Sequence, residues 1–333
     1  MRIAVTVDTE ADGQWEHGRP LATANVAVWP PFQDLCRRHD VRPTYLITSE
    51  IAEDPAAAAF LGPLVAAGDV EVGAHLHPWT TPPFADEPGL RRNDREHAYP
   101  CHLEPELLLA KLETLSAQVA RVSGALPTSY RAGRFGLDAV GARMPAGLGY
   151  EVDSSVTPFV SWADNPGRPG RGGGPDFRRH DARPFRVAAT GDPSLVELPV
   201  TIMPTYGATR RVPWLRDHWQ ARPVRLGRRA LHVLPRPQPL WLRPRPEYLL
   251  GDLQALVLEA ERTRLSCAVF MFHSSELLAG ASPYRPAHVD VDVLLRLLDD
   301  LFAWSHGRGH EFAGLTAAGR ALSAEGRLPI KEL

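Results

Sequence analysis

This sequence contains two pairs of side chains that could bind a metal or transfer protons. In each pair, one residue separates the two members. Asp8 and Glu10 end one run of Val, Ile and Thr residues, and His75 and His77 end another apolar run. Side chains two positions apart on an extended chain point to the same face, so each pair should act together. Two histidines and one carboxylate bind zinc or a similar divalent ion and leave room for water and substrate. The simpler alternatives are a helix cap for one carboxylate and a structural role for one histidine.

Polar residues end three further runs, and these could complete a site. They are Tyr130-Arg131-Ala132-Gly133-Arg134-Phe135-Gly136, Val152-Asp153-Ser154-Ser155 and Phe272-His273-Ser274-Ser275-Glu276. The glycines of the first permit close approach of the backbone. No phosphate-binding glycine motif occurs in these stretches, so nucleotide binding has little support. Ser274 and Ser275 lack the glycines of a nucleophile elbow, which disfavours a serine nucleophile.

The elements that must position these residues form a repeating pattern. Seven runs read as strands, at 3–8, 42–48, 70–76, 129–135, 150–157, 195–201 and 266–273. Helix-period segments such as 105–122 and 252–262 lie between them, as in a parallel sheet with crossover helices. Seven units favour a closed or nearly closed barrel, in which the active site lies at the carboxyl ends of the strands.

Composition sets the outer limits. The 333 residues are 44% hydrophobic and 23% charged, enough to bury a core, and we expect a single domain because no stretch reads as a linker. A net charge of −2 excludes a globally basic nucleic-acid binder. The sequence has no run of the ~18 apolar residues that a membrane span needs and no signal-peptide pattern, so we expect a cytoplasmic protein. Its three cysteines fall in no CxxC spacing, which argues against a disulfide framework or a cysteine metal site.

Three long irregular stretches interrupt the pattern, at 78–103, 159–193 and 210–246. The last is an insertion with ten arginines, one aspartate and three tryptophans, Trp214, Trp219 and Trp241. Tryptophan faces can stack on sugar rings and arginines can bind carboxylates or phosphates, so the insertion could hold an anionic or lipid-linked glycan. The alternative is a solvated surface, since arginine replaces lysine at nearly every cationic position of this chain.

Taken in order, five of these motifs resemble those of the polysaccharide deacetylases, the NodB-like carbohydrate esterase family. They begin with Val5-Thr6-Val7-Asp8-Thr9-Glu10 and Gly73-Ala74-His75-Leu76-His77-Pro78-Trp79, followed by the motifs around Arg131, Asp153 and His273. The resemblance covers the chain from Ile3 to about Ala303 and is strongest to the WalW-like branch. It implies an α/β fold, a distorted seven-stranded (β/α) barrel. It also implies a metal-dependent hydrolase that removes the acetyl group from an N-acetylated sugar of a surface polysaccharide or its precursor.

The same resemblance implies roles for individual residues. Asp8 would be the general base, and Glu10, His75 and His77 would hold a divalent metal, with zinc expected. Arg131 would orient the base, Asp153 would tune the acid, and His273 would be the general acid. In this sequence Thr9 separates the two acids of the first motif, the histidines are two apart instead of four, and Gly133 replaces a usual proline.

Two other functions stay open. One is a metal-dependent amidohydrolase acting on a small non-sugar amide, because a fold does not fix a substrate. The other is a non-catalytic carbohydrate-binding protein on the same scaffold, which the presence together of Asp8, Glu10, His75, His77 and His273 argues against. In either case the expected partner is a small molecule or a carbohydrate, with no nucleic acid and no membrane span, although a membrane-linked substrate would bring the protein to a membrane surface.

Overall fold

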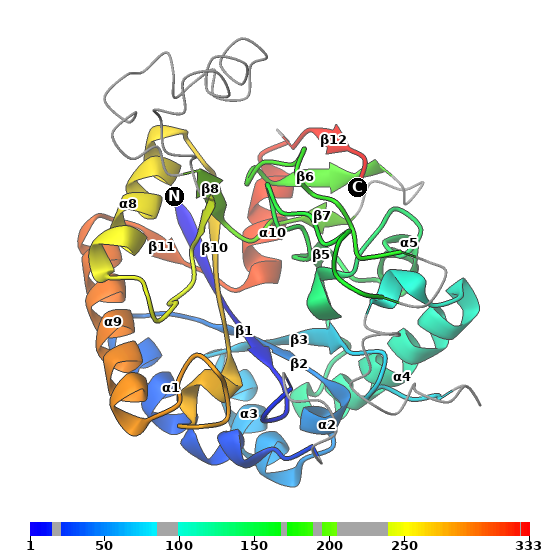
Figure 1. Cartoon of the computed structure of the whole chain (residues 1–333), viewed down its shortest axis with the longest axis horizontal. Coiled ribbons are helices and arrows are strands. Elements are labelled where there is room, and N and C mark those ends of the chain that lie inside the picture. Colours follow the sequence, from blue (N-terminus) through cyan, green and yellow to red (C-terminus); the bar gives the residue numbers. More distant parts are fainter. Residues whose placement is uncertain (15–20, 85–98, 168–171, 189–194, 205–238, 327) are drawn as a thin grey trace.

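A computed structural model describes all residues except 15–20, 85–98, 168–171, 189–194, 205–238 and 327. Its centre is a curled sheet that helices surround (Figure 1). The strands of this sheet are β1 (Arg2–Thr9), β2 (Thr44–Ile47), β3 (Glu71–Leu76), β4 (Ser129–Ala132), β5 (Val152–Asp153), β6 (Phe185–Val187), β7 (Val196–Glu197), β10 (Cys267–His273), β11 (Glu311–Phe312) and β12 (Ile330–Lys331). β8 (Ile202–Pro204) and β9 (Pro239–Trp241) form a separate antiparallel pair.

The sheet is mostly parallel. Its order is β10-β1-β2-β3-β4-β5-β7-β6-β12, and β11 pairs with β1. Among the strands of this sheet that the structure describes, only β6 and β7 pair in antiparallel fashion. Each of the seven predicted runs contains one strand of this sheet, and the α/β class is confirmed. The count of seven strands is not confirmed, because the short strands β6, β11 and β12 join the same sheet.

The chain after β7 and the chain after β9 both reach β10 at the far end of the sheet. The backbone N–H of Thr201 donates to the carbonyl of Val269 at 3.0 Å, and that of Leu242 donates to Thr201 at 2.8 Å. The N–H of Met271 in turn donates to the carbonyl of Leu242 at 3.2 Å. These bonds join the segments after β7 and after β9 to β10, and they place residue 243 beside the carboxyl end of β10.

Helices cover the outside of the sheet. The α-helices are α1 (Pro30–Arg38), α2 (Ser49–Ala52), α3 (Pro55–Ala67), α4 (Pro105–Ser123), α5 (Arg143–Gly147), α8 (Leu250–Arg262), α9 (His288–Gly307) and α10 (Leu315–Ala324). Short 3-10 helices are η1 (Ala24–Val28), η3 (Pro100–His102), η4 (Gly133–Phe135) and η7 (Ser274–Leu277). The predicted helices at 105–122 and 252–262 are confirmed as α4 and α8.

Local sequence explains where these helices begin and end. Pro105 opens α4, where a missing N–H costs nothing, and Gly124 ends it in the left-handed conformation. The core lies between helices and sheet; for example, Phe32 of α1 meets Phe272 of β10 edge to face, with ring centroids 5.1 Å apart. In the part of the chain that the structure describes, no helix is both long enough and apolar enough to cross a membrane.

Candidate active site

The carboxyl ends of four strands bring the predicted site residues together. Asp8 of β1 and His273 of β10 are register partners across one strand pair, and His75 of β3 and Arg131 of β4 are partners across another. Glu10 follows β1 directly and is buried. The pair Asp8–His273 and the pair His75–Arg131 therefore both lie at the carboxyl ends of their strands.

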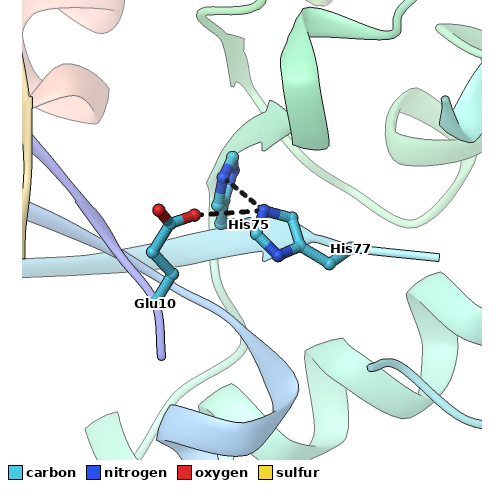
Figure 2. A group of neighbouring side chains, drawn as sticks. All are labelled: Glu10, His75 and His77. Atoms are coloured by element: carbon cyan, nitrogen blue, oxygen red, sulfur yellow. Dashed lines mark hydrogen bonds and ion pairs between the residues drawn. The ribbon is translucent and has the colours of Figure 1, made fainter. Parts of the chain in front are cut away.

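Glu10, His75 and His77 form a compact cluster that could hold one metal ion (Figure 2). One ligand atom from each residue lies within 4.8 Å of the other two. The Nε2 atoms of the two histidines are 3.1 Å apart, and Nε2 of His77 is 3.3 Å from Oε2 of Glu10. Ligands held at ~2.0–2.2 Å by a tetrahedral ion lie about 3.3 Å from one another, so these separations fit a zinc-like ion.

A hydrogen bond orients His75 as a ligand, and burial keeps both histidines in the form that binds metal. Nδ1 of His75 lies 2.9 Å from the carbonyl oxygen of Arg131, which can only accept, so Nδ1 carries the proton and Nε2 presents its lone pair. The ring of His77 stacks on Trp79, with centroids 4.4 Å apart. Burial lowers the pKa of His75 and holds the pKa of His77 well below its ordinary value. Both rings are therefore neutral, the form that binds metal.

Glu10 would supply the negative charge of the cluster when a cation is bound. Burial, followed by the nearby carboxylates of Asp8 and Glu50, raises the pKa of Glu10 well above its ordinary value. A buried carboxylate facing two neutral imidazoles is a donor set that a divalent cation stabilises. The residues present therefore fit the metal that the sequence predicted.

Asp8 is held by a fully buried arginine. Nη1 of Arg131 donates to Oδ1 of Asp8 and, at 3.0 Å, to the hydroxyl of Thr6. The other nitrogens of Arg131 donate to the carbonyl and hydroxyl oxygens of Ser154, at 2.7 and 2.8 Å. Burial acts to raise the pKa of Asp8, but Arg131, with His75 and His273, outweighs it and keeps that pKa below its ordinary value. Asp8 is thus an ionised carboxylate with its orientation fixed.

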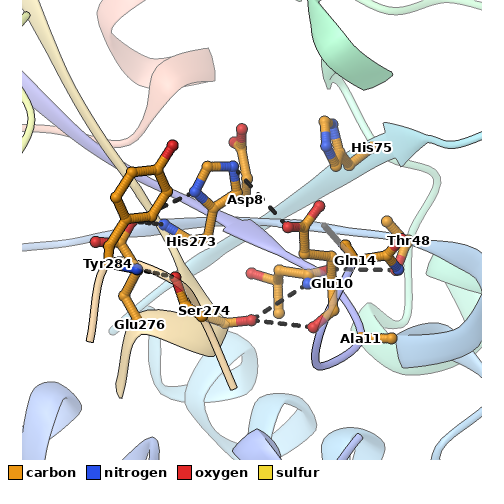
Figure 3. Close-up of polar contacts among 12 residues, drawn as sticks. Asp8, Glu10, Ala11, Gln14, Thr48, His75, His273, Ser274, Glu276 and Tyr284 are labelled. Carbon is orange, nitrogen blue, oxygen red and sulfur yellow. Dashed lines mark hydrogen bonds and ion pairs between the residues drawn. The ribbon is translucent and has the colours of Figure 1, made fainter. Parts of the chain in front are cut away.

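His273 faces the same cluster from β10, the strand at one end of the sheet order. Its Nε2 lies 3.9 Å from Oε1 of Glu10. Figure 3 shows its ring with Glu276 and Tyr284 on one side and Glu10 on the other. Two residues that the sequence had not assigned to the site contact its Nδ1: Oε1 of Glu276 at 3.3 Å and Nη2 of Arg243 at 3.0 Å.

Features of the sequence could have pointed to both of these residues. Glu276 belongs to the motif that carries His273, three residues further along the chain. Arg243 lies in the predicted insertion at 210–246, where a general excess of arginine concealed it. Residues 205–238 of that insertion, with Trp214 and Trp219, lie outside the described part of the structure. Trp241 is described: it is buried, and its ring centroid lies 5.8 Å from that of Phe135.

Asp153 lies in β5, and β1, β2, β3 and β4 stand between β5 and the strand β10 that carries His273. Asp153 is buried and accepts hydrogen bonds from the backbone and hydroxyl of Ser155, at 2.8 and 2.9 Å. Across the sheet it is the register partner of Glu197, and burial raises the pKa of both carboxyls. The carboxylate beside Nδ1 of His273 is that of Glu276, so an effect of Asp153 on the acid stays a prediction.

Comparison with known proteins identifies the fold. No model of a known protein family matches the sequence, and no curated protein matches it. Among solved structures, a Mycobacterium smegmatis protein classed as a polysaccharide deacetylase is similar, with a TM-score of 0.58, 16% identity and coverage of 100% of this chain and 93% of that one. Puue allantoinase gives a TM-score of 0.52 and 13% identity, covering 97% of this chain and 90% of that one.

A third similar structure is 4-alpha-glucanotransferase from Thermococcus litoralis. Its TM-score is 0.56 at 9% identity, and the match covers 96% of this chain and 40% of that one. At these levels of identity the comparisons establish architecture only. The chain has the barrel fold that polysaccharide deacetylases share with an allantoinase and a glucanotransferase, and its chemistry must be argued from its own site.

Proposed function

We propose that this protein is a metal-dependent hydrolase that removes the acetyl group from an N-acetylated sugar of a surface polysaccharide or its precursor. The observation that carries the proposal is the placement of Asp8 and His273 as neighbours on β1 and β10, directly beside the Glu10, His75 and His77 cluster. A base, an acid and a cation site at one strand end are the parts that hydrolysis of an amide requires.

The metal would be held by Glu10, His75 and His77. When bound, a divalent ion such as zinc polarises the amide carbonyl and makes a water molecule a better nucleophile near neutral pH. The residues of the chain supply proton transfer. Asp8, kept ionised by Arg131, takes the proton of the attacking water, and His273 gives a proton to the departing amine. The C–N bond breaks, acetate leaves, and the sugar keeps a free amine.

Finer features of the substrate belong to the same proposal. We place the protein in the WalW-like branch and expect an anionic or lipid-linked glycan, because the insertion at 210–246 combines ten arginines with three tryptophans. Raising the ionic strength should weaken binding of such a substrate, since the Debye length falls from ~10 Å at 0.1 M to ~3 Å at 1 M. Replacing Arg228 and Arg229 with alanine should flatten that dependence, and an unchanged slope would leave the insertion without a binding role.

The test is a direct assay of the purified, zinc-loaded protein. Acetate release from N-acetylglucosamine oligosaccharides is measured beside ring opening of allantoin, a small cyclic amide. Acetate release from the sugars alone supports the proposal. Hydrolysis of allantoin alone assigns the site to small non-sugar amides. Binding of the sugars without turnover of either substrate points to a non-catalytic carbohydrate-binding protein.

A further inference from the structure

We propose that Arg243 and Glu276 are a pair of positioning residues that hold the imidazole of His273 for proton donation. The inference rests on the proposed function, because it treats His273 as the acid of that reaction. It assigns to this chain a support for the acid that comes from two places in the sequence: the turn after β10 and the end of the insertion at 210–246.

Glu276 fixes His273 through a single oxygen atom. Oε1 of Glu276 accepts a hydrogen bond from the backbone N–H of His273 at 3.1 Å and lies 3.3 Å from its Nδ1. Glu276 is fully buried, at the third residue of η7, where a glutamate can reach back to the residue before the turn. Main chain and ring of His273 are thereby tied to the same carboxylate.

Arg243 completes the arrangement from the neighbouring segment. Its Nη2 donates to Oε1 of Glu276 at 3.0 Å and lies 3.0 Å from Nδ1 of His273. Its side chain is only 6% exposed, and the guanidinium lies 4.4 Å from the centre of the Tyr284 ring. A buried carboxylate needs a partner of opposite charge, and Arg243 supplies it.

Backbone hydrogen bonds of the neighbouring residue Leu242 set the position of Arg243. Leu242 is hydrogen-bonded on one side to Thr201 and on the other to Met271, two residues before His273. Arg243 therefore cannot move along β10 without breaking these bonds. Because Arg243 directly follows Leu242, the bonds of Leu242 to Thr201 and Met271 fix its place beside His273.

The pair also decides which nitrogen of His273 faces the reaction. Glu276 and Arg243 both occupy the Nδ1 edge of the ring, and Nε2 is left facing Glu10 at 3.9 Å. In the neutral ring, Nδ1 accepts from Nη2 of Arg243, which can only donate, so the ring proton is on Nε2. In the protonated ring, Nδ1–H donates to Oε1 of Glu276 instead, and Nε2–H is given to the amine. A ring free to rotate would present Nε2 in this direction for only part of the time, and the rate would fall accordingly.

Kinetics of variants test the proposal. Glu276→Ala and Arg243→Met should lower kcat by about 10- to 100-fold, with KM and bound zinc unchanged, because the acid is misplaced while the metal ligands stay intact. Arg243→Ala should lose kcat in the same way, and millimolar guanidinium ion should restore part of it by occupying the space that the shorter side chain leaves. The milder variants Glu276→Gln and Arg243→Lys provide the same comparison if the first two do not fold.

The matched control is Arg320→Met, which breaks another arginine–glutamate pair, with Glu151 on the surface. Its kcat should equal that of the wild type, with no response to guanidinium. A wild-type kcat in Glu276→Ala and Arg243→Met would overturn the proposal. So would a loss of kcat in Arg243→Ala that guanidinium does not reverse although the folded protein binds zinc normally.

A measurement without substrate separates this proposal from the proposed function. Nitrogen NMR of histidine-labelled protein, with the His273 signals assigned from His273→Ala, should show one fixed tautomer in the wild type and averaged signals in Glu276→Ala. If the wild type releases no acetate but shows this change, the positioning role stands and the deacetylase function fails. Identical ring signals in the two proteins would remove the positioning role whatever the activity.

Discussion

The backbone of Gly133 lies directly against the ring of His77. A β-carbon at position 133 would come 2.6 Å from Cδ2 of His77 and 2.5 Å from the carbonyl oxygen of Leu76. The first contact could be relieved only by turning the ring of His77, a proposed metal ligand, and the second only by moving the backbone of β3. The missing side chain of Gly133 is thus a condition for the position of His77.

Gly133→Ala should therefore lower zinc affinity by at least tenfold, and overpacking should cost about 1–3 kcal/mol of stability. Zinc titration and urea unfolding of the same protein measure the two effects. Gly147→Ala is the matched control, because its β-carbon would meet nothing within 4 Å and its position is helical. This control should bind zinc normally and be equally or slightly more stable. Normal zinc affinity in Gly133→Ala would show that the contact is unimportant.

The metal cluster itself can be tested at His75. His75→Ala removes one of three ligands, so the dialysed variant should hold much less than one zinc ion per chain, and its activity should fall in parallel. Elemental analysis gives the metal content. His306→Ala, at an exposed position of α9, should retain full zinc and full activity. A His75→Ala protein with wild-type metal content and activity would refute the assignment of His75 as a ligand.

The acid and base are tested by Asp8→Asn and His273→Ala. Each variant should keep its zinc and lose turnover by ~10²- to 10⁴-fold, because each removes one proton-transfer group and no predicted ligand. Steady-state kinetics with metal analysis on the same samples measure both. A variant that retains more than about a tenth of the wild-type rate would be incompatible with its assigned role.

The Arg243–Glu276 pair predicts a pH dependence of stability. Burial alone would raise the pKa of Glu276, but Arg243, with His273, lowers it from 4.5 to about 2. The folded carboxyl therefore releases its proton more readily than the unfolded one. Its stabilisation is fully present above pH 4.5 and is lost as the pH falls toward 2.

We expect Glu276→Gln to lower the free energy of unfolding by about 3 kcal/mol at neutral pH, because a pKa lowered from 4.5 to about 2 corresponds to a free-energy difference of about this size. The difference from the wild type should shrink steadily as the pH is lowered from 4.5 toward 2. Urea unfolding of both proteins across this range measures it. Two stability curves that stay parallel throughout would mean that Glu276 does not carry its charge in the way the structure indicates.

Much of the site could be predicted from local sequence. The alternation of side chains on an extended chain was enough to pair Asp8 with Glu10 and His75 with His77, since it depends only on consecutive backbone angles. Runs of β-branched residues likewise indicated a strand in each of the seven places where the structure has one. The short strands β6, β11 and β12 were not predicted, because two or three residues are too few to show an alternation of apolar and polar side chains.

The tertiary structure alone decided which residues far apart in the sequence come into contact. Asp153 was the expected partner of His273, yet it lies in β5 against Ser155 and Glu197, and Glu276 stands beside His273. Arg243 reaches His273 only because Leu242 is bonded between Thr201 and Met271, a contact set by how the whole sheet curls. Periodicity is a property of neighbours along the chain, whereas the pairing of buried charges depends on register between segments far apart in sequence. The sequence by itself determined the chemical groups and the faces they share, and the packing of the barrel determined their partners.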